Sequence, residues 1–102
     1  MSYREYRPPS TLEPVVACLW EHEPAEAHVQ RIVPDDCVDL IWESERELVI
    51  AGPDSGPRRV ALPAGARSSG VRLRPGAAGA FLRLPASELR DSQVAAAVVW
   101  GQ

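Results

Sequence analysis

Asp39 is the first candidate for a functional residue, because it is a charged residue within the apolar stretch from Val38 to Trp42. In a β-strand, alternation places Asp39 on the same face as Cys37 and Ile41. A carboxylate on such a face needs a partner if the face is buried. The sequence leaves two interpretations open: a structural ion pair, or an acid that faces a ligand in a pocket.

Arg72 and Arg74 are the basic residues that we expect to be able to form an ion pair with the Asp39 carboxylate. They alternate with Val71 and Leu73, which predicts that both guanidinium groups lie on one face of a strand. A pair of guanidinium groups binds a carboxylate or a phosphate ligand well. The alternative is that one or both form ion pairs with the acidic first half of the chain, for example with Glu5.

Trp20 and Trp42 are candidates for the walls of the same pocket, although buried tryptophans more often pack in a core. The two histidines, His22 and His28, are six positions apart across a proline-containing loop, which is a poor metal-ligand pattern. The chain also has no phosphate-binding loop, no dinucleotide fingerprint and no nucleophile elbow. We therefore expect a protein that is not an enzyme and that needs no metal or cofactor.

The charge is distributed unevenly along the 102 residues. Residues 1–57 carry a net charge of −8 and residues 58–102 a net charge of +5, so the two halves should attract each other in the folded chain. The net charge of the whole chain is −3, which argues against binding of nucleic acid by this domain alone. The length and the 45% hydrophobic content fit one globular domain.

Cys18 and Cys37 form no metal-type pair and no disulfide framework, so we expect both to be reduced in a cytoplasmic protein. The longest apolar run, Val94 to Trp100, is too short to cross a bilayer. The first residues lack the apolar segment of a signal peptide. Membrane association is therefore not expected.

Short strands separated by turn signals fill the middle of the chain and predict a β-rich (α+β) fold, a small antiparallel barrel or sandwich. We expect an extended arm over residues 1–10, a β-rich core over residues 11–74 and a helical tail over residues 75–102. Within the core, a turn of helix is expected over Leu12 to Val16. The strands are expected at residues 17–22, 28–33, 37–43, 48–51, 58–62 and 69–74.

Two further expectations concern how these segments connect. Pro34-Asp35-Asp36 is a turn signal, so residues 28–33 and 37–43 should pair as a hairpin. Asp91 is a suitable N-cap for a helix over Ser92 to Trp100. Pro85 to Leu89 should add one more helical turn before it.

Several segments together resemble the N-terminal domain of AraC-type transcriptional regulators. One is Pro34-Asp35-Asp36-Cys37-Val38-Asp39-Leu40-Ile41, which is similar to a Pro-Asp-Gly-x-x-Asp-Leu-Ile segment of that family. Asp36 replaces the usual glycine, and aspartate tolerates the left-handed conformation that such a turn favours. The other segments are Tyr3 to Pro9 with Leu12, Val16 and Trp20; Ala51-Gly52-Pro53; Gly70 to Ala77; and Pro85-Ala86, Leu89, Asp91 and Trp100-Gly101.

The resemblance implies a single regulatory domain over residues 1–102, often cupin-like, whose helix-turn-helix DNA-binding domain follows and is absent from this chain. It implies a domain that senses an unidentified small-molecule effector and controls that DNA reader. The alternative is a ligand-free module for homodimerisation or interdomain docking. The apolar stretch containing Val94, Val98 and Trp100 is the candidate surface for that contact.

Overall fold

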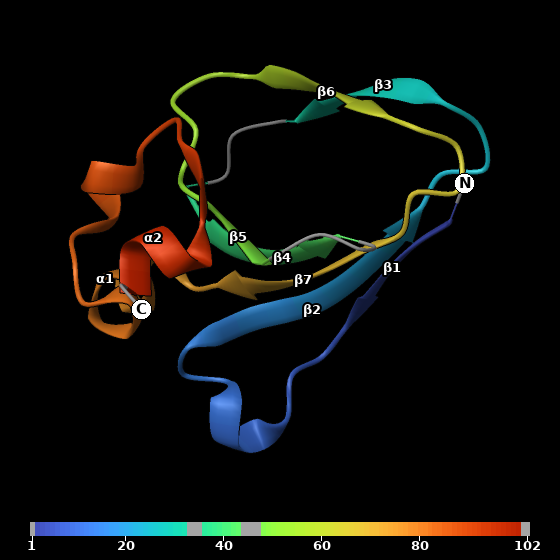
Figure 1. Ribbon diagram of the computed structural model, residues 1–102. Coiled ribbons are helices and arrows are strands. Elements are labelled where there is room, and N and C mark those ends of the chain that lie inside the picture. The colour runs from blue at the N-terminus through green and yellow to red at the C-terminus, as the bar shows by residue number, and fades with distance from the viewer. Residues whose placement is uncertain (1, 33–35, 44–47, 101–102) are drawn as a thin grey trace.

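The computed structural model describes residues 2–32, 36–43 and 48–100. It contains a six-stranded and a two-stranded antiparallel sheet, with two short α-helices near the C-terminal end (Figure 1). The β-rich prediction is confirmed, but the two sheets remain separate and do not close into a barrel. The strands are β1 Ser2–Tyr6, β2 Val16–Glu23, β3 His28–Ile32, β4 Val38–Glu43, β5 Leu48–Ala51, β6 Arg58–Leu62, β7 Ser68–Leu73 and β8 Gln93–Ala95. The helices are η1 Ser10–Leu12, α1 Pro75–Leu82, η2 Ala86–Leu89 and α2 Ala96–Trp100.

The larger sheet has the strand order β1-β2-β7-β4-β5-β8, and β3 pairs with β6 in the smaller one. The expected hairpin between residues 28–33 and 37–43 is therefore wrong. Strand β4 lies between β5 and β7 in the larger sheet, because its alternating Val38 and Leu40 fit a central position between two strands. The smaller sheet faces the larger one across the molecule (Figure 1).

One face of the larger sheet packs against the helices, and we call it the helix-side face. Register places Val38, Leu40 and Leu73 on this face, where they are 1%, 6% and 1% exposed. Ala78 and Leu82 of α1 complete the centre of this cluster. The remaining buried members are Val16, Ile50, Leu89 and Ala96.

The opposite face points toward the β3–β6 pair, and we call it the cavity-side face. Antiparallel register aligns Asp39 with Arg72 and Tyr3 with His22 on this face, as alternation requires. Val38 and Leu40 thus lie on one face of β4 and Asp39 on the other, as the alternation in the sequence predicts. Each described ion pair joins an arginine of residues 58–102 to an acid of residues 1–57, which confirms the attraction between the two halves.

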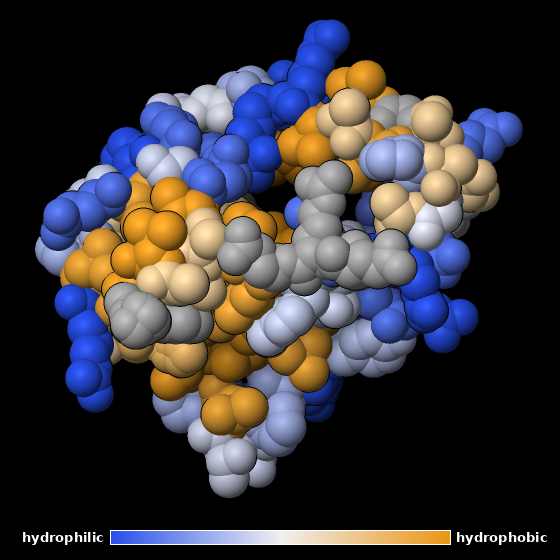
Figure 2. All heavy atoms as spheres, viewed as in Figure 1, coloured by the Kyte–Doolittle hydropathy of each residue, from blue (hydrophilic) through white to orange (hydrophobic). Residues whose placement is uncertain are grey.

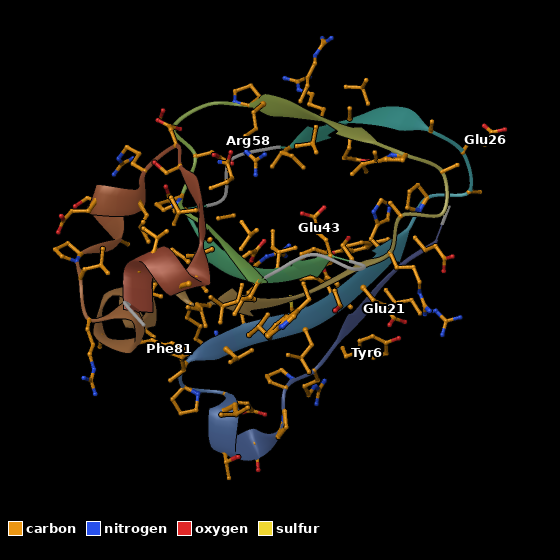
Figure 3. The ribbon with its side chains drawn as sticks, in the orientation of Figure 1. Tyr6, Glu21, Glu26, Glu43, Arg58 and Phe81 are labelled. Carbon is orange, nitrogen blue, oxygen red and sulfur yellow. The ribbon has the colours of Figure 1, made fainter. Side chains whose placement is uncertain are left out.

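The extended arm expected at the start of the chain contains an edge strand. Ser2–Tyr6 pair with β2 as the edge strand β1, from Ser2↔Glu23 to Tyr6↔Leu19. The Tyr6 hydroxyl donates a 2.5 Å hydrogen bond to Glu21 on β2. Figure 3 shows Tyr6 and Glu21 together on the side of the larger sheet that faces away from the β3–β6 pair. The expected helical turn over residues 12–16 is also wrong at its end, because Val16 already belongs to β2.

The C-terminal segment differs from the expected helix over residues 92–100. Gln93–Ala95 form the edge strand β8, and α2 starts only at Ala96. Asp91 does not cap a helix. Its carboxylate accepts two 2.7 Å hydrogen bonds, one from the backbone N–H and one from the hydroxyl of Ser55. Asp91 and Asp36 both have positive φ values, 58° and 60°, so the left-handed conformation expected at Asp36 is confirmed.

The contact between Asp91 and Ser55 predicts a pH-dependent contribution to stability. The backbone and hydroxyl hydrogen bonds from Ser55 lower the pKa of Asp91 below its usual value. A lowered native pKa stabilises the fold above the unfolded pKa and loses this effect as the pH falls through the native pKa. Urea unfolding should therefore show Asp91→Asn less stable than the unmodified chain near neutral pH, with the gap closing below about pH 4. Asp36→Asn, at the other left-handed aspartate, is the control, and an equal gap there would contradict the assignment.

Candidate functional site

A cavity of about 720 Å³ lies between the two sheets. Figure 2 shows the molecule hollowed between the β3–β6 pair and the larger sheet. The volume of this cavity lies within the range of small-molecule binding sites. Apolar side chains of both sheets, such as Ile41 and Val60, share the wall with charged and aromatic groups. In Figure 3, Glu43 points into the space between the sheets, and Arg58 of β6 points into the same space from the opposite side.

Arg72 is the charged centre of the cavity-side face. Its Nε lies 3.2 Å from Oδ1 of Asp39, and its Nη1 lies 3.6 Å from Oε2 of Glu5. The Tyr3 hydroxyl donates a 2.7 Å hydrogen bond to the same Glu5 oxygen. Of the two open interpretations, the structure thus shows the ion pair, including the bridge to Glu5.

The protonation of this cluster is well defined. Burial lowers the pKa of Arg72, but the charge of Asp39 and a hydrogen bond with Tyr3 outweigh burial, so its pKa is raised above the usual value. Burial, and then the hydrogen bond to Glu5, raise the pKa of Tyr3. Arg72 is therefore charged and Tyr3 neutral at neutral pH. Arg72 acts as a fixed cation with two carboxylates already beside it.

Arg74 does not join Arg72, and the prediction that both point together is wrong. β7 ends at Leu73, and Arg74 is the N-cap residue of α1. Its Nε donates a 2.5 Å hydrogen bond to the backbone oxygen of Glu13, outside the cavity. Alternation fails here because Pro75 opens the helix one residue after the arginine.

Trp20 forms part of the cavity wall, beside Tyr3 on the neighbouring strand. The two rings are stacked with centroids 6.2 Å apart and planes inclined by 28°. Opposite Trp20 in β7 stands Gly70, where an added Cβ would lie 2.4 Å from Cε2 and Cζ2 of the indole. Only glycine leaves room for the indole in this position. The indole Nε1 is buried without a hydrogen-bond partner among the described residues.

Trp42 lies on the other face of β4, as alternation with Val38 and Leu40 requires. It does not line the large cavity and is 45% exposed, so neither the pocket nor the core interpretation applies to it. It borders a smaller hollow of about 340 Å³ together with Glu23 and Arg67, which pair at 3.5 Å. Trp42 is therefore a tryptophan outside the candidate site, and its substitution can serve as a control for substitution of Trp20.

Asp54 lines the cavity from the loop after β5, although no sequence pattern singled it out. Asp54 is only 8% exposed, and its Oδ2 accepts a 3.1 Å contact from Nε of Arg58. Its Oδ1 is buried without a hydrogen-bond partner among the described residues. A four-residue spacing between an acid and an arginine predicts an ion pair in a helix. Asp54 and Arg58 have this spacing, but they lie in and after a Gly-Pro loop, where the spacing predicts nothing.

The residues proposed for a dimer or interdomain surface fall into different environments. Val94 is half-buried and packs against the core cluster, whereas Val98 on α2 is 74% exposed. The side chain of Trp100 lies outside the described part of the chain. Cys18 and Cys37 are not disulfide-bonded.

Within residues 2–32, 36–43 and 48–100, no group of three or more His, Cys, Asp or Glu side chains is placed to hold a metal ion. The helices of the described residues are all too short or too polar to span a bilayer.

The fold and the cavity together define a β-rich domain with a hollow of ligand size between two sheets. Residues 4–95 match the model of the family described as Domain of unknown function (DUF6597), and the chain belongs to this family. No curated protein matches the chain, and no solved structure matches it.

Proposed function

We propose that the chain is the effector-sensing, regulatory domain of an AraC-type transcription factor in the cytoplasm, and not an enzyme. It controls DNA binding by a C-terminal helix-turn-helix domain that lies outside these 102 residues. The linked AraC-like motifs support the family assignment, and the cavity of about 720 Å³ supports sensing of a small molecule. Two sheets that face each other around this cavity also fit a cupin-like domain.

The observation that carries the proposal is the direct connection between the cavity and α2. Register places Gln93 and Ala95 of β8 on the same face as Ala51 and Val49, and all four residues line the cavity. Helix α2 starts at the next residue, Ala96, which is 7% exposed and packs in the core. A ligand that shifts β8 therefore moves α2 without an intervening loop.

This connection provides a physical route for regulation. An effector with different affinities for two positions of β8 and α2 shifts the equilibrium between them. A DNA-binding domain that contacts α2 would then bind its operator with a different affinity. The coupling energy sets the size of that difference, commonly from fivefold to about a hundredfold.

The test joins residues 1–102 to the DNA-binding domain of an AraC-type regulator and measures its affinity for its operator by fluorescence anisotropy. Compounds are first selected by thermal shift, since a ligand that binds the folded state raises the melting temperature. A stabilising compound should change operator affinity by at least about fivefold. The same compound should have no effect on operator binding by a fusion whose cavity is filled by Ala51→Trp. Identical affinity with and without every stabilising compound would refute sensing.

The exposure of Val98 favours a second candidate, a ligand-free docking or dimerisation module. Val98 is 74% exposed on the short apolar helix α2, which makes it the candidate contact residue. Light scattering on the unmodified chain and on Val98→Ser separates the two. A dimer that dissociates in the variant supports docking, and an unchanged monomer counts against it.

A further inference from the structure

The cavity-side face of the larger sheet carries one continuous apolar row. Antiparallel register aligns Trp20 and Ile41 with Gly70 from its two sides. The same register aligns Ile41 with Val49, and Val49 with Ala95. The row therefore crosses β2, β7, β4, β5 and β8, which is about 19 Å at the usual spacing between strands. We call these five residues the apolar row.

The side chains of the apolar row are accessible from the cavity. Trp20, Ile41, Val49 and Ala95 all line it, and each is only half-buried. At Gly70 the indole of Trp20 takes the place of a side chain, because an added Cβ would lie 2.4 Å from two of its ring atoms. The core cluster lies on the helix-side face of the sheet, so it does not cover this row.

The β3–β6 pair adds apolar side chains to the facing wall. Val60 and Leu62 of β6 line the cavity, whereas Val29 of β3 is 61% exposed. Register pairs Val29 with Ala61, the residue after Val60, so the two valines lie on opposite faces of this small sheet. A ligand on the apolar row therefore meets apolar groups from both sheets, and burial of its own apolar surface stabilises the complex.

The charges around the cavity are balanced. The described lining contains three arginines and three carboxylates, namely Arg31, Arg58, Arg72, Asp39, Glu43 and Asp54. Arg58 pairs with Asp54 at 3.1 Å, and Arg72 pairs with Asp39 at 3.2 Å. A ligand with a net charge would have to compete with one of these pairs or enter the cavity without a counter-charge. Both alternatives cost free energy.

The other charges lie beside the apolar row and not on it. Glu43 follows Ile41 by two positions on β4, so it lies about 7 Å farther along the strand. Arg31 is exposed, and alternation directs it to the outer face of the β3–β6 pair. At the β1 edge the row ends beside Glu5, which lies 3.6 Å from Arg72. The row thus offers a ligand apolar contact along its whole length.

We propose that the cavity binds an uncharged, elongated apolar molecule, which lies along the apolar row between the two sheets. The volume of about 720 Å³ is large enough for such a molecule with one neutral polar group at its end. This inference rests on the proposed sensing function and names the chemical class of its effector. It departs from the carboxylate or phosphate ligand suggested by Arg72 and Arg74 in the sequence, because Arg72 is already paired and Arg74 lies outside the cavity.

The first test measures binding of matched probes to the full chain by isothermal titration calorimetry. Octan-1-ol, octanoate and octylamine share one apolar chain and differ in charge at neutral pH. The alcohol should bind at least about tenfold more tightly than either charged probe. Shorter alcohols should bind about fourfold more weakly for each CH₂ group removed from the apolar contact. Equal or tighter binding of a charged probe, or an affinity independent of chain length, would overturn the proposal.

Two matched substitutions then locate the ligand. Val60→Thr places a hydroxyl in the apolar wall and should weaken binding of octan-1-ol by at least about fivefold. Val29→Thr makes the same change on the outer face of the same small sheet and should leave the affinity unchanged. Threonine suits a β-strand as valine does, so both variants should fold, which circular dichroism checks. Equal losses in both, or no loss in Val60→Thr, would show that the alcohol binds elsewhere.

Tryptophan fluorescence gives an independent location. An apolar ligand on the row replaces water beside Trp20 and should shift its emission to shorter wavelength. Trp20→Phe should remove this shift, and Trp42→Phe should keep it because Trp42 does not line the cavity. A shift that persists in Trp20→Phe would place the ligand away from the apolar row and contradict the proposal.

The outcomes distinguish this inference from the function on which it rests. If octan-1-ol does not bind at about 1 mM, the assignment of an uncharged apolar ligand is wrong. Sensing itself still stands if another compound stabilises the chain and changes operator affinity in the fusion. If the alcohol binds in the cavity but no compound that binds there ever changes operator affinity, the ligand class is right and the regulatory function is wrong.

Discussion

Replacing Gly52 by alanine is expected to lower the free energy of unfolding by about 3 kcal/mol. Gly52 is buried where the loop after β5 crosses η2, and its N–H donates a 2.9 Å hydrogen bond to the backbone oxygen of Ser92. A Cβ at this position would stand 1.8 Å from the backbone oxygen of Leu89 and 2.5 Å from its carbonyl carbon. Backbone atoms cannot rotate away as a side chain does, so the loop or η2 must move.

Gly56 supplies the matched control in the same loop. A Cβ there would meet no atom within 4 Å. Gly56→Ala should therefore change stability by less than about 0.5 kcal/mol, with a slight gain from the stiffer unfolded chain. Urea unfolding followed by circular dichroism measures both variants. Similar losses for the two alanines would show that the close approach of Gly52 to Leu89 is not rigid.

The strands were predictable where turn residues bracket them. The bounds of β5 and β6, Leu48–Ala51 and Arg58–Leu62, agree with the sequence prediction because Gly52 to Pro57 separates them clearly. The pairing of strands was not predictable in the same way. Alternation assigns faces to residues but does not say which strand is the neighbour, so β3 was assigned to β4 although it pairs with β6.

The candidate site shows the same division between local pattern and tertiary register. Asp39 and Arg72 were singled out from charge and alternation, and the structure pairs them. The fit of Trp20 over Gly70 depends on the register between β2 and β7, which no local pattern contains. Asp54 was missed for a similar reason, because its burial is produced by the fold and not by its own segment.

Arg72→Met is expected to lower the free energy of unfolding by about 2 kcal/mol, because it removes the one cation between two carboxylates. The side chains of Arg72 and Asp39 are 24% and 21% exposed, so solvent screens their interaction only in part. Methionine keeps most of the apolar stem of the arginine, so lost packing contributes little. The substitution removes the positive charge that lies 3.2 Å from Asp39 and 3.6 Å from Glu5.

A double-mutant cycle with Asp39→Asn, measured by urea unfolding, isolates the pair. The loss caused by Arg72→Met should be smaller when Asp39 is already neutral. It should also shrink in strongly acidic solution, because protonated carboxyl groups no longer carry the charge that Arg72 neutralises. Arg67→Met, at an exposed ion pair, should show neither the loss nor this pH dependence. A loss independent of both pH and Asp39 would mean that Arg72 stabilises the sheet by packing alone.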